Sequence, residues 1–417
     1  MRPNLLGAQR LHSAGPQNMQ SELGLQSESF IVREHRSSEA FRELEREWRS
    51  LESFAATPFV TWDWAVAWWA QLREAKLGVT DSLSIRSVRT QEGRLVAIAP
   101  MLISRRPSLG PIRVRQLQFF GADPNITEQR GLLALPGLER DAYRALLEHA
   151  LQHAGDWDSM CLSGIPVDAD FGELQSSPDF EWRGQTADYT LVVPKSWEAF
   201  RSTLPRNIKE SLRKCFNAPK RDGLNFQLNV VETVDGVDAA LEDFFRLHAA
   251  RAERQETVHH FDIFSTPEAK GFLKDVCRRF AERDALRIFQ LKLGQKVIAT
   301  RIGFIAGETL YLYYSGYDPE FAQYSVMTTT VAEAIRYGIE HGFSRVNLST
   351  GKDVSKTRWA PSERVTRQAL VMSSTTRAKI THHMYRQALH AIGSMPALRR
   401  ATSFLARRST PPQQLAR

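Results

Sequence analysis

A run of basic residues near the middle of the chain is the first feature whose residue types and spacing could bind a ligand. Arg206, Lys209 and Arg213 stand in the segment 204–214. A helix starting near Pro205 would place the three side chains along one flank, because residues three and four apart are neighbours on a helix. Such a strip suits anionic groups. The same run is also compatible with a solvated linker helix.

Thiol and metal chemistry find little support in the sequence. Cys161, Cys215 and Cys277 are isolated and lack Cys-x-x-Cys spacing, so we expect free structural cysteines. His259 and His260 have no carboxylate or cysteine at ligand spacing, which favours a solvated loop. We therefore expect no metal.

Two distant stretches share the pattern aromatic, any residue, Gly, any residue, Asp, Pro. They are residues 119–124 and 314–319, and each ends an apolar run. Similar strand-like segments and Gly-containing turns flank both stretches. The pattern predicts one unit built twice, with Asp123 and Asp318 at equivalent turns. So long a period indicates tandem domains rather than a solenoid.

Each half is predicted to run helix, helix, three-strand meander, helix, strand. In the second half we expect helices over 237–253, 267–283 and 327–341, and strands over 286–293, 296–305, 310–317 and 345–348. The tryptophans within 62–69 are expected in the core or as a wedge between domains. The predicted divisions are a disordered N-terminus 1–28, a first domain 29–185, a second domain 186–370 with a basic helix 204–222, and a basic tail 371–417.

Basic charge is concentrated at the C-terminus. The chain has 417 residues, which suits two or three domains, and a net charge of +8. From residue 376 onward there are eight Lys or Arg and no Asp or Glu, so the rest of the chain holds 47 basic and 47 acidic residues. This balance gives no reason to expect DNA as a partner. We expect a solvated or partly helical tail, with weak contact to an anionic membrane as the alternative.

No apolar run approaches the ~20 residues needed to span a bilayer. The first 28 residues also lack the apolar segment of a signal peptide. We therefore expect a cytoplasmic protein, with peripheral attachment at the inner face of the membrane as the alternative.

The second half resembles a known group of acyltransferases. The stretches that carry the resemblance are 204–214, Leu247-His248, Ile298-Ala299, 314–319 and Asn347-x-x-x-Gly351-x-x-x-x-Lys356-x-x-Trp359. Their order and spacing are similar to the BioF2-like or CelD/BcsL-type acetyltransferases, which are related to the Fem-type peptidoglycan aminoacyltransferases. The resemblance covers about residues 191–361. It implies an α/β fold with a mixed sheet and tandem GNAT-like domains.

The sequence departs from that family at three positions. Asn347 and Ser355 stand where Asp and Tyr are usual, and Ser325-Val326-Met327 stands where Ser-Pro-Gly is usual. In a GNAT fold this turn presents backbone N–H groups to the pyrophosphate of coenzyme A, and glycine permits close approach. Met327 narrows the turn, while the hydroxyl groups of the threonines that follow it offer additional donors.

The resemblance also implies roles for individual residues. Acyl transfer to an amine needs a base, an acid for the leaving thiolate and stabilisation of the developing negative charge. The predicted catalytic residues are Lys356, Asp318, Tyr317 and Tyr314. The predicted cofactor-binding residues are Ser325, Met327, Thr328 and Thr329, and the predicted substrate-binding residues are Arg206, Lys209, Arg213, His248, Asn347 and Trp359. A tyrosine in a strand is usually a core or rim residue, and Asp-Pro is usually a helix-entry turn. Lys356 is also compatible with a surface ion pair.

The reaction expected from the resemblance is transfer of an acetyl group from acetyl-CoA. The acceptor would be an amine or hydroxyl on a sugar-containing or cell-envelope precursor. One alternative is a Fem-type enzyme that uses aminoacyl-tRNA. Another is a non-catalytic GNAT-fold binding protein in envelope polysaccharide biosynthesis.

Overall fold

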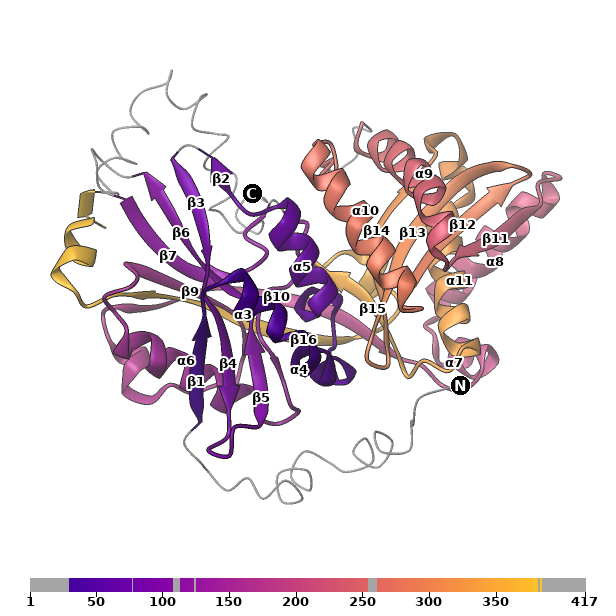
Figure 1. The fold of residues 1–417 in the computed structure, drawn as a ribbon. Helices are drawn as coiled ribbons and strands as arrows, with labels where there is room; N and C mark the ends of the chain where they lie inside the picture. The colour runs from indigo at the N-terminus through magenta and orange to yellow at the C-terminus, as the bar shows by residue number, and fades with distance from the viewer. Residues whose placement is uncertain are drawn as a thin grey trace.

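The computed structural model describes residues 30–76, 78–107, 113–123, 125–253, 261–381 and 383–384. His259 and His260, the predicted disordered N-terminus and most of the predicted basic tail lie outside these residues. The described part forms two similar halves that share one large sheet (Figure 1).

The first half begins with a strand that the sequence did not predict, followed by short helices. Its elements are β1 (Ile31–His35), α3 (Ser38–Glu43), α4 (Glu45–Leu51), α5 (Trp62–Gln71), β2 (Ala75–Lys76), β3 (Val79–Leu83), β4 (Ile85–Arg89), β5 (Leu95–Ala99), β6 (Met101–Pro107), β7 (Arg113–Phe119), β8 (Leu133–Ala134), α6 (Glu139–Gln152) and β9 (Ser159–Pro166). The short 3-10 segments η1 (Glu52–Phe54), η2 (Pro58–Val60) and η3 (Gly172–Ser176) also belong to it. The long strand β10 (Phe180–Val192) leads into the second half, and the predicted boundary at 185/186 falls inside it.

The second half follows the same order of elements. It contains α7 (Trp197–Thr203), α8 (Arg206–Arg221), β11 (Phe226–Val231), α9 (Val234–Ala252), α10 (Pro267–Glu282), β12 (Leu286–Leu293), β13 (Lys296–Ala306), β14 (Thr309–Tyr317), η4 (Pro319–Tyr324), α11 (Val326–Glu340), β15 (Arg345–Thr350), α12 (Val354–Thr357) and β16 (Ser362–Met372). The predicted meander and the three predicted helices are confirmed to within a few residues at each end.

The large sheet joins the halves by exchanging their last strands. Its order is β11-β12-β13-β14-β15-β10-β16-β9-β7-β6-β3-β2. Strand β10, which follows the first half, pairs with β15, and β16, which ends the second half, pairs with β9. Only β14–β15 and β7–β9 are parallel pairs among the described strands. The exchange makes each half complete the sheet of the other.

The first-half meander differs from the prediction because it is divided between two sheets. Strands β4 and β5 form a small sheet with β1 and β8, whereas β3 and β6 belong to the large sheet. The breaks fall at Ser84 and Pro100. Pro100 has no N–H to donate to a strand ladder, so the ladder is broken where β5 ends and β6 begins.

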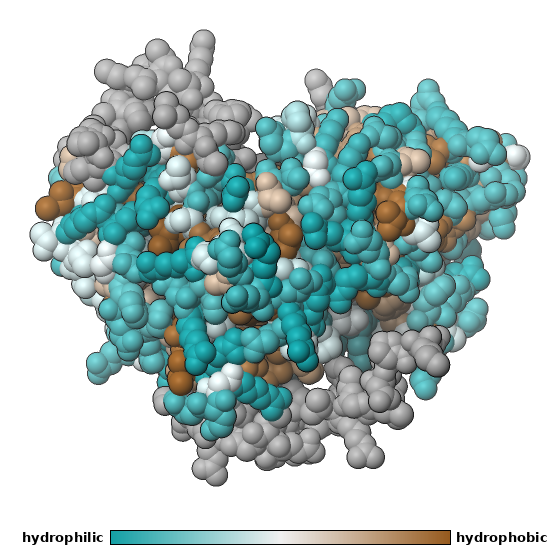
Figure 2. All heavy atoms as spheres, in the orientation of Figure 1, coloured by the Kyte–Doolittle hydropathy of each residue, from teal (hydrophilic) through white to brown (hydrophobic). Residues whose placement is uncertain are grey.

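Two apolar cores lie on opposite faces of the second half. One contains Phe244, Phe272 and Tyr313 beneath α9 and α10, and it continues into the first half. The other contains Leu212, Leu310 and Ile335 beneath α8 and α11. Burial of these apolar faces provides the main driving force for the fold. The face seen in Figure 2 is largely hydrophilic, with apolar residues in small scattered groups.

Helix α5 packs between the two halves, which is one of the two positions predicted for its tryptophans. The Trp64 ring packs on Phe272 at 5.0 Å and on Tyr313 at 5.7 Å, both from the second half. Its indole N–H donates to Thr127 Oγ1 at 3.2 Å, and the Trp68 indole donates to Asp123 Oδ2 at 2.8 Å. The helix therefore connects the second-half core to the loop that follows β7.

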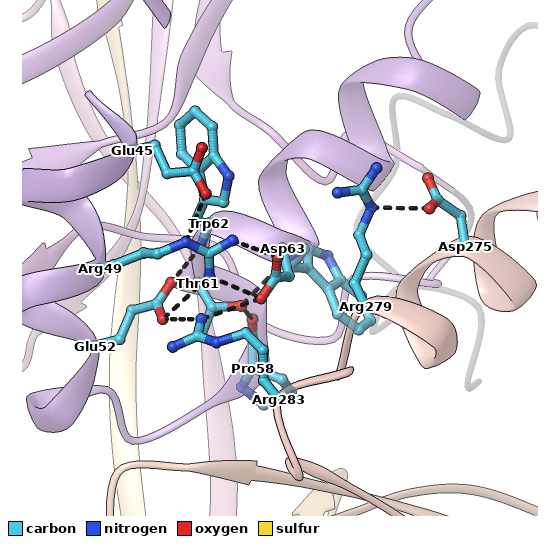
Figure 3. Close-up of polar contacts among 11 residues, drawn as sticks. Glu45, Arg49, Glu52, Pro58, Thr61, Trp62, Asp63, Asp275, Arg279 and Arg283 are labelled. Carbon is cyan, nitrogen blue, oxygen red and sulfur yellow. Dashed lines mark hydrogen bonds and ion pairs between the residues drawn. The ribbon is translucent and has the colours of Figure 1, made fainter. Parts of the chain in front are cut away.

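An ion network supports the same contact (Figure 3). Asp63 on α5 accepts from Arg49 at 3.0 and 2.9 Å and from Arg283 at 3.2 Å. Arg283 follows α10 and also donates to Glu52 at 2.7 Å. Because Asp63 is buried, these contacts compensate its desolvation.

Each motif aspartate follows a strand that has a parallel partner, β7 with β9 and β14 with β15, but the surroundings of the two aspartates differ. Asp123 is buried and accepts from the N–H and hydroxyl of Thr127 at 3.0 and 2.7 Å. Asp318 caps η4 and pairs with Lys296 at 2.7 Å. The motif glycine before Asp318 is required by close packing, because a Cβ on Gly316 would lie 2.4 Å from the backbone nitrogen of His248.

Candidate active site

Strands β14 and β15 separate before either of them ends. Their parallel pairing covers Thr309–Tyr311 on β14 and 345–347 on β15. Beyond these residues β14 continues to Tyr317 and β15 to Thr350, without further pairing to each other in the described register. A wedge-shaped gap, which we call the wedge, therefore opens between the two strands. Backbone N–H and C=O groups on its rim can bind an extended ligand.

The loop 121–130 of the first half closes one side of this wedge. Asn125 has φ of 73°, a left-handed conformation that asparagine tolerates better than most residues. Its side-chain amide donates to the Tyr314 hydroxyl at 2.7 Å, and that hydroxyl donates to the Asn125 carbonyl at 2.8 Å. The Tyr313 hydroxyl donates to the Ile126 carbonyl. The loop is thus fixed along β14.

Glu128 projects from this loop into the wedge and contacts both strands. Its carboxylate accepts from the Tyr311 hydroxyl on β14 at 2.6 Å. It also accepts from Ser349 Oγ on β15 at 2.8 and 2.9 Å. Ser349 has φ of 75°, a strained conformation for a residue with a Cβ. A carboxylate from the first half therefore spans the opening of the second half.

Lys356 lies within electrostatic range of this carboxylate. Its ammonium group donates to the carbonyl of Thr350 and, at 3.3 Å, to that of Gly351. Asp353 Oδ2 lies 3.6 Å from Nζ. Short helix α12, capped by the Asp353 side chain, carries the lysine back towards the end of β15. Glu128 and Lys356 interact electrostatically, so the structure brings a predicted catalytic residue to an unpredicted acid.

The environments of these two groups shift their pKa values in opposite directions. Burial raises the pKa of the Glu128 carboxyl, although the charge of Lys356 acts against this shift. Burial lowers the pKa of Lys356, although Glu128 and Asp353 oppose that shift. Burial also raises the pKa of the Tyr311 hydroxyl well above its ordinary value. Opposed shifts in neighbouring acid and base groups are typical of catalytic centres.

Arg301 on β13 completes the group that we call the Glu128 cluster: Glu128, Arg301, Tyr311, Ser349 and Lys356. The arginine donates to the Tyr313 carbonyl and to Ser315 Oγ, each at 3.2 Å. Burial lowers its pKa to about 10, so it stays charged near neutral pH. Partial exposure of Glu128, Arg301 and Lys356 leaves the cluster accessible to solvent.

Asp188 on β10 anchors the surroundings of the cluster. It accepts from Gln129 at 2.8 Å, from Arg364 at 3.0 Å and from Asn347 at 2.9 Å. These partners come from the loop 121–130, from β16 and from β15. The exchanged strands β10 and β16 therefore hold the first-half loop against the second-half wedge.

The predicted residues Tyr314 and His248 lie beside the wedge on the side of α9. Their rings are 5.8 Å apart, and His248 Nδ1 lies 3.1 Å from the Ser315 carbonyl. Burial lowers the pKa of His248, which favours its neutral form. Burial raises the pKa of Tyr314 well above its ordinary value. Both groups therefore act as neutral hydrogen-bonding groups, and their assigned roles stay predictions.

The other predicted catalytic residues stand at the end of β14. Tyr317 is buried against Ile298 and Val326 in a small apolar cluster. Lys296 holds the pKa of Asp318 below its ordinary value, against the effect of burial. Asp318 is therefore a charged cap at neutral pH, outside the Glu128 cluster.

The predicted cofactor turn is the start of α11. Ser325 has φ of 55°, and no side chain caps this helix end. The first-turn N–H groups of a helix lack intrahelical partners, so they can receive an anion. Thr329 is buried, and its hydroxyl has no hydrogen-bond partner among the described atoms, whereas Met327 and Thr328 are partly exposed.

The predicted basic strip lies on the outer face of α8. Arg206 pairs with Glu210 at 2.7 Å, and Lys209 donates to the Ser202 carbonyl at 2.8 Å. Arg213 is exposed. The far end of α8 contacts η4 near the cofactor turn, about 24 Å from the start of this helix. The strip is therefore separated from the cofactor turn by most of the helix length.

Asn347 and Trp359 are built into the frame of the second half. The Asn347 amide donates to Asp188 and Thr190, and its oxygen accepts from the Ser349 N–H at 2.7 Å. Trp359 is buried in the core below α8 and α11. The predicted contacts of Asn347 and Trp359 with substrate stay predictions.

Sequence reasoning missed Glu128, Arg301 and Ser349. The available signal was the position of Glu128, an acidic residue four positions after Pro124 of the first repeated motif. Only the packing of the two halves against each other shows that Glu128, from the first half, lies at the wedge of the second half.

No metal centre accompanies this arrangement within the described ranges: no group of three or more His, Cys, Asp or Glu side chains is placed to hold an ion. Within the same ranges, no helix combines the length and apolar character required to cross a membrane.

Comparison with known proteins identifies the second half. Residues 205–357 match the family model described as "Acetyltransferase (GNAT) domain". This segment therefore matches a GNAT acyltransferase domain. It contains the wedge, the cofactor turn and most of the Glu128 cluster. A search of curated proteins finds no match.

Solved structures resemble the whole described architecture. The crystal structure of FemX aligns with a TM-score of 0.51 at 11% identity, covering 80% of this chain and 96% of that one. The C-terminal DUF2156 domain of a putative lysylphosphatidylglycerol synthetase from Agrobacterium fabrum gives 0.44 at 11% identity, with 82% and 96% covered. A tandem GNAT protein from the clavulanic acid biosynthesis pathway gives 0.41 at 11% identity, with 83% and 99% covered. At 11% identity the likeness to FemX concerns the fold alone. The fold is the predicted tandem GNAT-like α/β architecture.

Proposed function

We propose that this protein transfers an acyl group from a coenzyme A thioester to an amine or hydroxyl, with acetyl-CoA as the first donor to test. The observation that carries the proposal is the Glu128 carboxylate, which spans the wedge of a GNAT domain beside Lys356. We further propose, from the sequence resemblance, that the acceptor is a sugar-containing or cell-envelope precursor.

The proposed reaction forms a bond from the acceptor nitrogen or oxygen to the acyl carbon and breaks the carbon–sulfur bond. Glu128 accepts the proton of the acceptor, because its raised pKa makes it a stronger base than an ordinary carboxylate. Lys356 stabilises the negative charge that develops on the thioester oxygen. The departing thiolate takes a proton from the Tyr314 hydroxyl or from water. Atoms and charges therefore balance without a metal or redox partner.

The donor is proposed to lie along the free rim of β14, with its pyrophosphate at the start of α11. The amide groups of the pantetheine arm can pair with the unpaired backbone of the wedge. The uncapped N–H groups near Ser325 can bind the phosphates. Met327 occupies the position where a smaller residue would allow closer approach.

Calorimetry with acetyl-CoA and desulfo-CoA tests this donor. We expect both to bind the wild type, and Met327→Gly to bind them equally well or more tightly. The effect on binding of removing the charges of Lys220 and Arg221, at the end of α8 that contacts η4, is compared with the effect of removing those of Arg206 and Lys209. If neither wild type nor Met327→Gly binds either ligand, the coenzyme A proposal is rejected.

Aminoacyl-tRNA is the second donor to test, because the fold likeness to FemX covers both halves of the chain. Transfer from a charged tRNA without binding of coenzyme A would establish this alternative. Absence of transfer and of binding with both donors would favour the non-catalytic role.

A further inference from the structure

Arg301 is a partly buried charged group whose contacts are unusual for an arginine in such a position. Its Nη1 and Nη2 atoms donate to a carbonyl and a hydroxyl, which are both neutral acceptors. Its Nε atom is buried and has no hydrogen-bond partner in the described structure. None of the ion pairs found among the described residues includes Arg301. Glu128 and Asp353 act on Arg301 only through longer-range electrostatics. A desolvated guanidinium that makes no direct ion pair with a carboxylate is costly, so its retention calls for an explanation.

A second guanidinium converges on the same point. Arg251 on α9 donates to Ser315 Oγ at 3.1 Å, the atom that also accepts from Arg301 at 3.2 Å. The positive charge of Arg251 acts against that of Arg301. Two like charges that share one hydroxyl repel each other, and an anion bound by Arg301 would weaken that repulsion.

This pair lies at the wedge and not on a remote surface. Ser315 belongs to the part of β14 beyond its pairing with β15. Arg301 interacts electrostatically with Glu128, the proposed base. An anion bound here would therefore belong to one of the reacting substrates.

We infer that Arg301 is a binding residue for a carboxylate carried by a substrate of this enzyme. A carboxylate suits the site better than a phosphate dianion, because the nearby Glu128 carboxylate repels a second negative charge more strongly. A planar guanidinium also matches the geometry of a carboxylate. The inference rests on the proposed acyl transfer. The carboxylate belongs either to the acceptor or to a dicarboxylic acyl group on the donor.

Thermal unfolding with free glutarate tests the subsite independently of coenzyme A. We expect glutarate to raise the Tm of the wild type more than sodium chloride at equal ionic strength. Arg301→Gln should abolish this difference, and without ligand it should leave the Tm unchanged or raised, because it removes an unpaired charge. Arg301→Lys should retain part of the glutarate effect.

The matched control is Arg287→Gln on the adjacent strand β12. Arg287 is also buried, but it pairs with Glu232 at 3.3 Å and with Asp284 at 2.9 Å. Its loss should lower the Tm and leave the glutarate effect intact. If instead Arg301→Gln lowers the Tm as Arg287→Gln does, with the glutarate effect unchanged, Arg301 is structural and the inference fails.

Calorimetry with succinyl-CoA and butyryl-CoA distinguishes the two sources of the carboxylate. For a donor carboxylate, succinyl-CoA should bind roughly 10- to 100-fold more tightly than butyryl-CoA, and Arg301→Gln should remove the difference. For an acceptor carboxylate, the two donors bind equally while the Arg301-dependent glutarate effect remains.

The inference is overturned if glutarate stabilises no more than chloride and succinyl-CoA binds no more tightly than butyryl-CoA. Binding of desulfo-CoA under those conditions would leave the proposed acyl transfer standing. Conversely, Arg301-dependent glutarate binding without any binding of desulfo-CoA would reject coenzyme A and retain the subsite.

Discussion

Substitution of Glu128 by glutamine removes the proposed base while keeping the size of the side chain. The carboxylate accepts from Tyr311 at 2.6 Å and from Ser349 at 2.8 and 2.9 Å. Glutamine keeps one acceptor oxygen, but its amide presents donors where the carboxylate presents an acceptor. Loss of a charge-assisted hydrogen bond, about 1.5–3 kcal/mol, is offset by removal of a desolvated charge. We therefore expect a change in the free energy of unfolding of only about 1–2 kcal/mol.

The expected effect on catalysis is larger. A general base contributes about 10²- to 10⁴-fold, so kcat should fall by that factor in Glu128→Gln. The assay is acyl transfer from the donor that calorimetry identifies, measured as kcat/KM against pH. In the wild type, activity should rise with pH as Glu128 loses its proton, at a pKa above the ordinary 4.5. This rise should be absent from the variant.

The same shift predicts how stability depends on pH. Because the folded pKa of Glu128 is raised, ionisation of this group is less favourable in the folded than in the unfolded protein. Its protonated form therefore contributes stability that is lost as pH rises from the unfolded to the folded pKa. Glu128→Gln should lack this loss, so its stability relative to wild type should increase over that range.

Glu363→Gln is the control for these measurements. Glu363 also accepts a hydrogen bond from a tyrosine, the Tyr189 hydroxyl at 3.1 Å, but it is exposed on β16. We expect it to leave activity and the pH profile unchanged. If Glu128→Gln keeps wild-type turnover and the same rise with pH, Glu128 is not the base and the reasoning from the buried cluster is wrong.

Three further predictions concern other residues. Lys356→Ala should raise the activation barrier by about 2.7–4 kcal/mol, measured as the fall in kcat. It should lower the free energy of unfolding, measured with denaturant, by much less. Wild-type turnover in the variant would contradict the assignment. Gly316→Ala should lower the free energy of unfolding by about 1–3 kcal/mol, measured by denaturant unfolding, because the new Cβ would lie 2.4 Å from the His248 nitrogen. Gly155→Ala, which meets no atom within 4 Å, is its control, and equal effects would refute the steric argument. Asp63→Ala should destabilise by about 1–3 kcal/mol, a value reduced for the partial exposure of its arginine partners. An unchanged denaturation midpoint would show that this ion network contributes nothing.

The repeated order of elements was predictable from sequence because it depends on local patterns. The apolar periodicity of α9 and α10, and the Gly-containing turns between β12, β13 and β14, predicted the second half within a few residues. Lys356 was likewise singled out by its spacing to Trp359 within the resemblance, and its catalytic role stays a prediction. Strand β1 was not predicted, because a single edge strand with a partly exposed face carries a weak pattern.

The composition of the candidate site was decided by tertiary structure alone. Glu128 and Ser349 are 221 positions apart, and their contact depends on the exchange of β10 and β16 between the halves. Arg301 looks in sequence like any arginine in an alternating strand, since periodicity does not report whether a partner charge lies nearby. Sequence patterns determine which elements form and which faces they bury. Which charges meet at the wedge, and which remains without a carboxylate, follows only from how the two halves pack together.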